Sequence, residues 1–306
     1  MISDNFNLDV FKIPVLLLVF NRPETTIEVF EKISQVKPAK LYIACDGPRK
    51  DNDEIKKVEQ VKKIVANINW PCEVKTLYRE KNLGCRNAVS QAITWFFDNE
   101  EMGIILEDDC LPSQSFFWFC EDLLHKYKNE ERIGMISGNN FFEDEKLKES
   151  YFFSYGNIWG WASWKRAWQN YDVKINLWKN QKIKDSIKTF LNNDYIYKNF
   201  KTYFDDAYDG KDTWAHQWLF TRISNKQLTI NPCKNLVSNI GFGKNATHTK
   251  KYNEFSNVKS FEIKFPLTHP LNIKLDTNYV SKKYPKSKID KLIFFFKKFF
   301  KLIIKK

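Results

Sequence analysis

Strand-like segments alternate with longer helical stretches along the first half of the chain. Apolar or alternating segments lie at 14–20, 40–46, 73–78 and 103–106, and polar stretches with helical spacing separate them. Two further strand-like segments lie at 133–137 and 228–230. This alternation predicts an α/β fold, a mostly parallel sheet flanked by helices.

The fourth segment ends abruptly in three consecutive acids, Glu107, Asp108 and Asp109. In an extended chain, Glu107 and Asp109 would share one side while Asp108 takes the other. Adjacent carboxylates raise each other's pKa unless a positive group lies among them. A divalent cation such as Mn²⁺ or Mg²⁺ suits such oxygen ligands. The alternative is a solvated acidic loop after a core strand.

Further polar residues follow the other predicted strands: Arg22, Asp46 and Arg79. Ligand sites of open α/β sheets lie at the carboxyl ends of the strands, so these groups outline a cleft with cations for phosphates and carboxylates for a metal. No Gly-rich phosphate loop and no Gly-x-Gly-x-x-Gly follows a strand. These features favour a nucleotide-sugar as the ligand.

The net charge of +12 is concentrated at one end of the chain. Residues 282–306 contain ten lysines and a single acid, so the rest of the chain is nearly neutral, which argues against nucleic acid as a partner. Lysines interrupt every apolar run of this tail, so it cannot span a bilayer. We expect it to lie on an anionic membrane surface. Docking on the body or on a partner is the alternative.

Composition and length place the chain in the cytosol as one large domain with appendages. The six cysteines show no paired spacing and predict reduced thiols, and the first residues lack the features of a signal peptide. We expect a catalytic domain over 1–250, an extension over 251–281 and the basic tail over 282–306. Within the domain, 13–138 would bind the nucleotide-sugar, and 139–250 would supply the acceptor half and a lid loop.

An ordered set of segments resembles the GT-A glycosyltransferases. The segments are 15–23, 46–48, 82–88, 106–109, 156–162 and 235–249. They are most similar to bacterial family-two-like enzymes and to the N-acetylglucosaminyltransferase that initiates complex N-glycans, whose metal motif is also Glu-Asp-Asp. The resemblance implies a metal-dependent inverting transfer of sugar from a UDP-sugar to a glycan or lipid-linked oligosaccharide. It also implies a cytoplasmic enzyme, peripheral on the inner face of the membrane.

The same resemblance implies roles for single residues. Asp46 should contact the uracil and Arg22 the diphosphate. The first two acids of the triplet should contact the ribose and sugar of the donor, and Asp109 should ligate the metal. Arg86 matches an arginine at a helix start, either as a donor contact or as a surface residue that braces the loop.

The catalytic base is expected near residue 212. Asp212 is positioned to cap a helix. The position that carries the base in the related enzymes is Ala215 here, so Asp212 and His216 are the candidates, and we expect Asp212. Their alternative roles are a helix cap and a half-buried imidazole. In the lid loop His248 could reach the diphosphate or metal, although a lone loop histidine usually does neither.

Four tryptophans, at 159, 161, 164 and 168, lie close together beside two glycines. Aromatic rings can stack on sugars, but we expect at least two of the four to be core residues. Two other functions fit the chain: a nucleotidyltransferase that makes an activated sugar, and a catalytically silent sugar-binding protein. A nucleotidyltransferase should carry a Gly-rich basic loop after its first strand, which this chain lacks, whereas Ala215 favours the silent protein.

Overall fold

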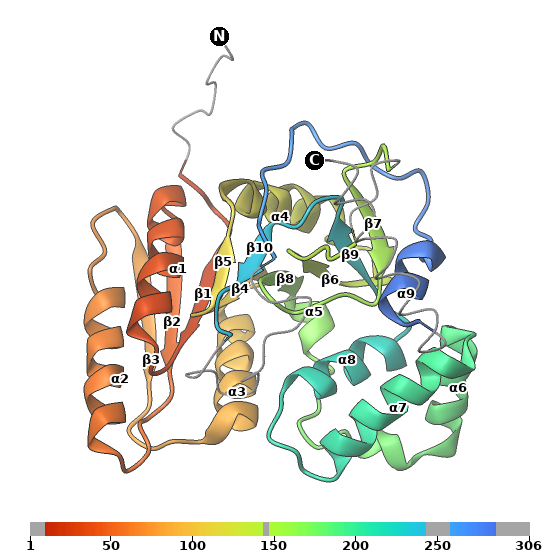
Figure 1. Cartoon of the computed structure of the whole chain (residues 1–306), viewed down its shortest axis with the longest axis horizontal. Coiled ribbons are helices and arrows are strands. Elements are labelled where there is room, and N and C mark those ends of the chain that lie inside the picture. Colours follow the sequence, from red (N-terminus) through yellow and green to blue (C-terminus); the bar gives the residue numbers. More distant parts are fainter. Residues whose placement is uncertain (1–9, 143–146, 243–257, 286–306) are drawn as a thin grey trace, which may run out of the picture.

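The computed structural model describes residues 10–142, 147–242 and 258–285 (Figure 1). An eight-stranded sheet forms the centre, with the order β3-β2-β1-β4-β8-β6-β9-β7. Its strands are β1 (Val15–Val19), β2 (Lys40–Cys45), β3 (Glu73–Tyr78), β4 (Met102–Glu107), β6 (Ile133–Ser137), β7 (Tyr151–Ser154), β8 (Trp161–Trp164) and β9 (Leu228–Pro232).

The first four strands are parallel, so their carboxyl ends meet at one edge. Val15 of β1 pairs with Leu41 of β2 on one side and with Ile104 of β4 on the other. β8 runs antiparallel to both β4 and β6, and β7 runs antiparallel to β9. A separate two-stranded ribbon joins β5 (Cys110–Pro112) to β10 (Val237–Asn239). The predicted mostly parallel α/β fold flanked by helices is therefore confirmed.

Helices cover both faces of the sheet (Figure 1). The strand side chains alternate between two cores: Leu17 of β1 packs in the one that contains α1 (Pro23–Val36), α2 (Asn52–Val65) and α4 (Gln114–Lys126). Leu18 packs in the other, with α3 (Gly84–Asn99), α5 (Lys165–Trp168) and α8 (Ala215–Ser224). A strand buried on both faces is apolar at every position, which is why β1 has no polar residue.

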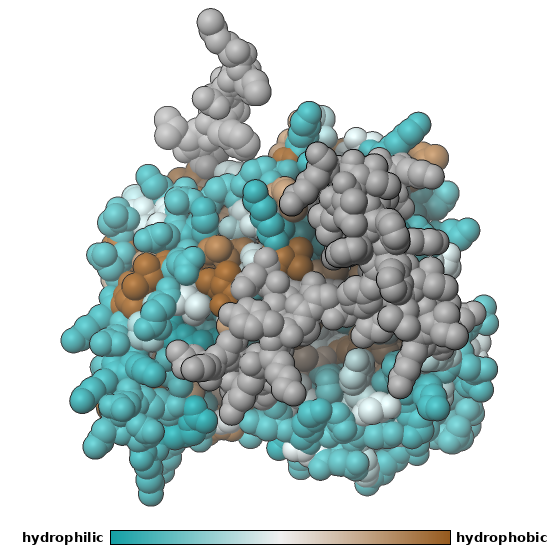
Figure 2. All heavy atoms as spheres, in the orientation of Figure 1, coloured by the Kyte–Doolittle hydropathy of each residue, from teal (hydrophilic) through white to brown (hydrophobic). Residues whose placement is uncertain are grey.

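The stretch between 172 and 210 contains a short 3-10 turn, Asn176–Lys179, followed by α6 (Gln181–Leu191) and α7 (Asp194–Tyr208). With α8 they form the helical part at the lower right of Figure 1. In the same orientation, hydrophilic side chains cover most of the described surface, and apolar atoms gather over α1 (Figure 2).

The N-terminus of α4 is capped from a distant part of the chain. Ser113 occupies the N-cap position, but its side chain makes no capping hydrogen bond. Instead, the carboxylate of Glu262 accepts hydrogen bonds from the backbone N–H groups of Gln114 (3.1 Å) and Ser115 (2.8 Å). A carboxylate at a helix N-terminus satisfies free N–H groups and the helix dipole. It also holds the C-terminal extension on the body.

The described part of the extension ends in α9 (Thr277–Lys283), and Val280 of this helix lies in the main core. Lys283, which we expected in the basic tail, packs on the body. Its ammonium group donates hydrogen bonds to the backbone oxygen of Gly156 (2.6 Å) and to Oδ1 of Asn157 (2.5 Å). Within the described residues, no helix is long and apolar enough to cross a bilayer.

Candidate functional site

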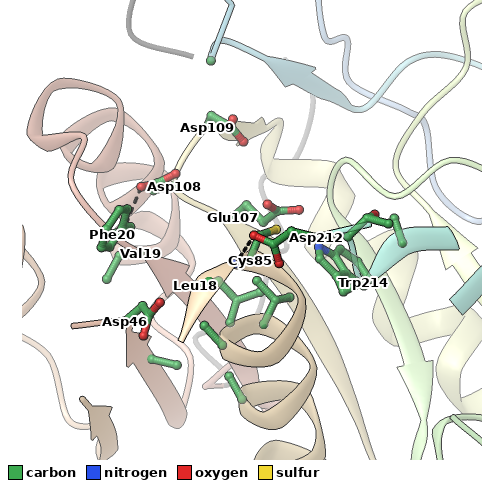
Figure 3. A pocket seen from close by; sticks show the side chains of 18 of the residues that line it. Leu18, Val19, Phe20, Asp46, Cys85, Glu107, Asp108, Asp109, Asp212 and Trp214 are labelled. Carbon is green, nitrogen blue, oxygen red and sulfur yellow. Dashed lines mark hydrogen bonds between the residues drawn. The ribbon is translucent and has the colours of Figure 1, made fainter. Parts of the chain in front are cut away.

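A cavity of about 550 Å³ opens at the carboxyl ends of β1, β2 and β4, between the sheet and the start of α8 (Figure 3). Eight of the ten residues predicted for the site line it: Arg22, Asp46, Arg79, Glu107, Asp108, Asp109, Asp212 and His216. They come from chain segments nearly 200 residues apart. The site thus forms where the parallel topology predicts a ligand.

Arg22 lies between two acids of the triplet. Its Nη1 is 2.6 Å from Oδ2 of Asp109, and its Nη2 pairs with Oδ1 of Asp108. Asp108 also accepts a hydrogen bond from the backbone N–H of Phe20 at 3.3 Å (Figure 3). The predicted alternation of the three acids is wrong, because β4 ends at Glu107 and both aspartates lie in a turn directed toward Arg22.

The acidic cluster keeps a surplus of negative charge, because one guanidinium faces three carboxylates. Burial, with Asp109 nearby, raises the pKa of Glu107 to about 8. Burial also raises the pKa of Asp108 to about 6, although Arg22 opposes this shift. Both carboxylates would ionise more readily beside a second positive charge.

The donor set of this cluster fits a hard divalent cation. Its free groups are carboxylate oxygens, the ligands that Mg²⁺ and Mn²⁺ prefer. Within residues 10–142, 147–242 and 258–285, no three Asp, Glu, His or Cys side chains converge in a geometry that could hold a metal. Mg²⁺ sites that use one or two protein carboxylates take further oxygens from substrate phosphates, so a site completed by the substrate matches this arrangement.

Asp46 joins the end of β2 to the loop before α3. Its carboxylate accepts hydrogen bonds from the backbone N–H groups of Gly47 (2.9 Å) and Leu83 (3.0 Å). Burial raises the pKa of Asp46, and these N–H groups oppose the shift. Part of the hydrogen-bonding capacity of the Asp46 carboxylate is therefore used within the protein. A contact with a nucleobase would use its remaining acceptor capacity.

The two other predicted arginines differ in position. Arg79 lines the cavity near Asp46, and burial lowers its pKa. Arg86 is not among the lining residues; its Nη1 donates a hydrogen bond to the backbone oxygen of Gly210 at 3.2 Å. This contact matches the bracing role that was the alternative for Arg86. His248 lies outside the described residues.

Asp212 does not cap the helix that follows it. α8 begins only at Ala215, and its N-cap residue, Trp214, makes no side-chain capping bond. The predicted cap is wrong, because the Asp212 carboxylate instead accepts hydrogen bonds from the backbone N–H groups of Cys85 (3.2 Å) and Arg86 (2.7 Å), at the start of α3 (Figure 3). Asp212 therefore connects the start of α3 to the segment before α8, and this connection closes the cavity.

His216 lines the cavity from the first turn of α8 and packs against Tyr203, with ring centroids 4.8 Å apart. Burial, with Lys211 nearby, lowers the pKa of His216, so the imidazole is neutral at pH 7. Its Nδ1 is buried without a hydrogen-bond partner. A neutral imidazole has the lone pair that a general base requires.

Two features of the site were missed by sequence reasoning. Gly241 packs directly on the ion pair: a Cβ atom there would lie 2.2 Å from Oδ2 of Asp109 and 2.7 Å from Nη1 of Arg22. Cys85 lies between Glu107 and Asp212 (Figure 3), and burial raises its pKa to about 12, which excludes a thiolate nucleophile. The glycine-bearing loop was the available signal for the role of Gly241. Nothing in the sequence indicated the position of Cys85.

No protein-family model matches the chain, and no curated protein sequence matches it. Several solved structures are similar over about half of it. A mannosyltransferase from Pyrobaculum calidifontis, in complex with GDP-Man and Mn²⁺, is 12% identical over 52% of this chain and 46% of its own, less than half its length, with a TM-score of 0.36. A 4-diphosphocytidyl-2C-methyl-D-erythritol synthase from Anaerococcus prevotii is 10% identical over 53% of this chain and 77% of its own (TM-score 0.32). A cytidylyltransferase from Leptospira borgpetersenii is 12% identical over 52% of this chain and 62% of its own (TM-score 0.32).

Proposed function

We propose that the chain is a metal-dependent inverting glycosyltransferase that moves sugar from a UDP-sugar, or a related nucleotide-sugar, to a glycan or lipid-linked oligosaccharide. The acidic cluster carries this proposal. Glu107, Asp108 and Asp109 face a cavity at the strand ends, and Arg22 neutralises only part of their charge. A cation held between these acids and a diphosphate would remove the remaining imbalance.

The donor would lie along the ends of β1, β2 and β4. Asp46 and Arg79 line the part of the cavity formed by β2 and the loop before α3, where the nucleoside is expected. Asp109 would ligate the metal, and Mn²⁺ or Mg²⁺, when bound, would stabilise the leaving diphosphate. Arg22 holds the two aspartates in place. It would also contribute positive charge near the leaving diphosphate.

The base would lie on the opposite side, at the start of α8. The Asp212 carboxylate already accepts two backbone hydrogen bonds from the start of α3. The imidazole of His216 is neutral at pH 7, and its Nδ1 makes no hydrogen bond. We therefore propose that His216 takes the proton of the acceptor hydroxyl, while Asp212 keeps α3 in position. Direct attack opposite the leaving diphosphate inverts the anomeric centre.

A nucleotidyltransferase remains the second candidate function. Such an enzyme would need a loop that wraps the phosphates of a nucleoside triphosphate. Here β1 ends at Val19 and α1 begins at Pro23, so only Phe20, Asn21 and Arg22 separate them. The short connection favours a transferase, which uses a nucleoside diphosphate.

The basic tail would hold the enzyme on the inner face of the membrane. α9 packs on the body as far as Lys283, so the segment available for lipid begins at about Lys286 and contains eight lysines. Lysines close to an anionic leaflet contribute about 1 kcal/mol each. A lipid-linked acceptor would lie at the same surface.

The test is a thermal-shift screen of nucleotide-sugars with and without Mn²⁺, followed by a hydrolysis assay on those that bind. A glycosyltransferase should be stabilised by a nucleotide-sugar only when the metal is present, and should slowly release a nucleoside diphosphate and free sugar. Release of pyrophosphate from a nucleoside triphosphate and a sugar phosphate would identify a nucleotidyltransferase. Metal-dependent binding without any turnover would identify the silent sugar-binding protein.

A further inference from the structure

The cavity lining includes aromatic residues as well as the acidic cluster. Trp159 and Phe242 are lining residues, as are Thr213 and His216 from the segment that leads into α8. The nucleoside is proposed to contact other segments, namely β2 and the loop before α3. The aromatic residues are therefore available to a part of the substrate other than the nucleotide.

Trp159 differs from the three tryptophans that follow it. Trp161, Trp164 and Trp168 are 1%, 2% and 3% exposed and belong to the core. Trp159 is half-buried and reaches the cavity. Three of the four tryptophans are thus accounted for by packing, and this residue is the one available to a ligand.

Phenylalanines from two other loops support Trp159. Its ring centroid is 5.3 Å from that of Phe141, at 66°, and 5.6 Å from that of Phe242, at 82°. Phe242 directly follows Gly241, which packs on Asp109. The aromatic cluster of Phe141, Trp159 and Phe242 therefore lies next to the acids at which the reaction would occur.

The loop that carries Trp159 is held in a defined conformation. It lies between Gly156 and Gly160, whose φ angles of 80° and 65° are accessible mainly to glycine. Lys283 donates hydrogen bonds to Gly156 and Asn157 from α9, and Asn157 contacts the hydroxyl of Tyr279 at 3.5 Å. A ring fixed in this way loses little conformational entropy when a ligand stacks on it.

We propose that Trp159, supported by Phe141 and Phe242, is the stacking platform for a pyranose ring of the acceptor glycan. The proposal rests on the proposed function and specifies its acceptor as a carbohydrate with an exposed apolar ring face. C–H groups of a pyranose pack on an aromatic ring as other apolar groups do, and the hydroxyls at the ring edge would reach the polar residues beside it. His216, the proposed base, lines the same cavity.

The experiment compares full-length wild type, Trp159→Ala, Trp159→Phe and the control Tyr195→Ala, whose side chain is exposed on α7 outside the cavity lining. Saturation-transfer NMR measures binding of methyl β-D-glucopyranoside and methyl β-D-galactopyranoside, with sorbitol as the acyclic comparison. Each protein is also titrated with UDP and Mn²⁺ by calorimetry, and circular dichroism checks its folding.

We expect transfer to the ring protons of at least one pyranoside and none to sorbitol. This binding should weaken about tenfold in Trp159→Ala, which corresponds to about 1.4 kcal/mol, and should be largely retained in Trp159→Phe and Tyr195→Ala. The affinity for UDP with Mn²⁺ should be the same in all four proteins.

Equal pyranoside binding by wild type and folded Trp159→Ala would overturn the proposal, as would its absence from wild type. A loss of UDP affinity in Trp159→Ala would also overturn it and assign the ring to the donor. Failure of the proposed function has a different signature, since UDP would then bind none of the four proteins while Trp159-dependent binding of the pyranoside persisted.

Discussion

The carboxylate of Asp212 accepts a hydrogen bond from the backbone N–H of Arg86 at 2.7 Å, across 126 residues of sequence. Asp212 also accepts one from Cys85, so it caps α3 instead of its own helix. This capping connects α3, in the first half of the chain, to the helical part that carries His216. In the proposed function, positioning and proton transfer belong to two residues, Asp212 and His216.

The first prediction concerns the base. His216→Gln should lower turnover by about 10²- to 10⁴-fold at saturating donor, with donor affinity unchanged. Asp212→Asn should retain far more activity but lose up to about 1 kcal/mol of unfolding free energy, because the amide keeps only one acceptor oxygen for the two N–H groups of α3. Turnover, calorimetric donor affinity and chemical denaturation measure the three quantities. If Asp212→Asn abolishes turnover while His216→Gln remains active, Asp212 is the base.

The second prediction concerns metal-dependent donor binding. Asp109→Asn should abolish Mn²⁺-dependent binding of the nucleotide-sugar and leave the fold intact, because the side chain lies in a turn at the cavity. Loss of an anionic ligand should weaken metal binding by something on the order of a few kcal/mol. Asp98→Asn, on the exposed side of α3, is the control. Unchanged Mn²⁺-dependent affinity in Asp109→Asn would remove the metal role from this residue.

The third prediction is a pH dependence. A cation binds the charged forms of Glu107 and Asp108, whose pKa values burial raises to about 8 and about 6. Below pH 6 both are protonated, so Mn²⁺-dependent affinity for a UDP-sugar should rise with pH up to about 8 and then level off. For each proton released on binding, the affinity rises by up to about tenfold per pH unit.

Calorimetry in buffers of different ionisation enthalpy would detect the proton release directly. A UDP-sugar is preferable to UDP, because its diphosphate has no terminal oxygen that titrates near neutrality. In Glu107→Gln the rise between pH 6 and 8 should disappear. An affinity that is flat with pH in wild type would contradict the prediction.

The fourth prediction concerns Gly241. In Gly241→Ala the new methyl group would meet Oδ2 of Asp109 and Nη1 of Arg22, so the ion pair must separate or the loop must move. Metal-dependent nucleotide affinity should fall at least tenfold. Gly210→Ala is the control: its φ of 93° strains an alanine, but its Cβ would meet nothing closer than Nη1 of Arg86 at 3.9 Å. A metal-dependent affinity in Gly241→Ala that is no lower than in Gly210→Ala would contradict the prediction.

The fifth prediction concerns the tail. Deletion of 286–306 keeps α9 and should release the protein from anionic liposomes, while activity on a soluble acceptor analogue stays normal. Even half of the deleted lysines, at about 1 kcal/mol each, would hold the full chain on such vesicles at physiological salt. Sedimentation with vesicles that contain phosphatidylserine, and with neutral vesicles as control, measures the effect. Persistent co-sedimentation of the truncated protein would show that the anchor lies elsewhere.

Local patterns were sufficient to predict β1, β2, β3, β4, β6 and β9, whereas β5, β7, β8 and β10 were not predicted. β1 and β4 are recognisable because a strand buried on both faces must be apolar throughout, and the amphipathic helices between them require a parallel sheet. That topology in turn predicted that Arg22, Asp46 and the acidic triplet would meet at one edge. The cluster of tryptophans at 159–168 was also recognisable in the sequence. The sequence did not indicate which of these rings would reach the cavity.

Contacts between distant segments decided the rest. Ser113 and Asp212 each lie just before a helix, yet Glu262 caps the first helix and Asp212 caps α3. A free N–H group can donate to any carboxylate that folding brings within reach. The turn after Glu107 directs both aspartates to Arg22, which strand alternation cannot show. The sequence by itself determined the sheet, the acids and the sheet edge at which they lie. The tertiary structure decided which charges pair, which helix each carboxylate caps and which tryptophan faces the cavity. These features depend on distances between residues far apart in the chain.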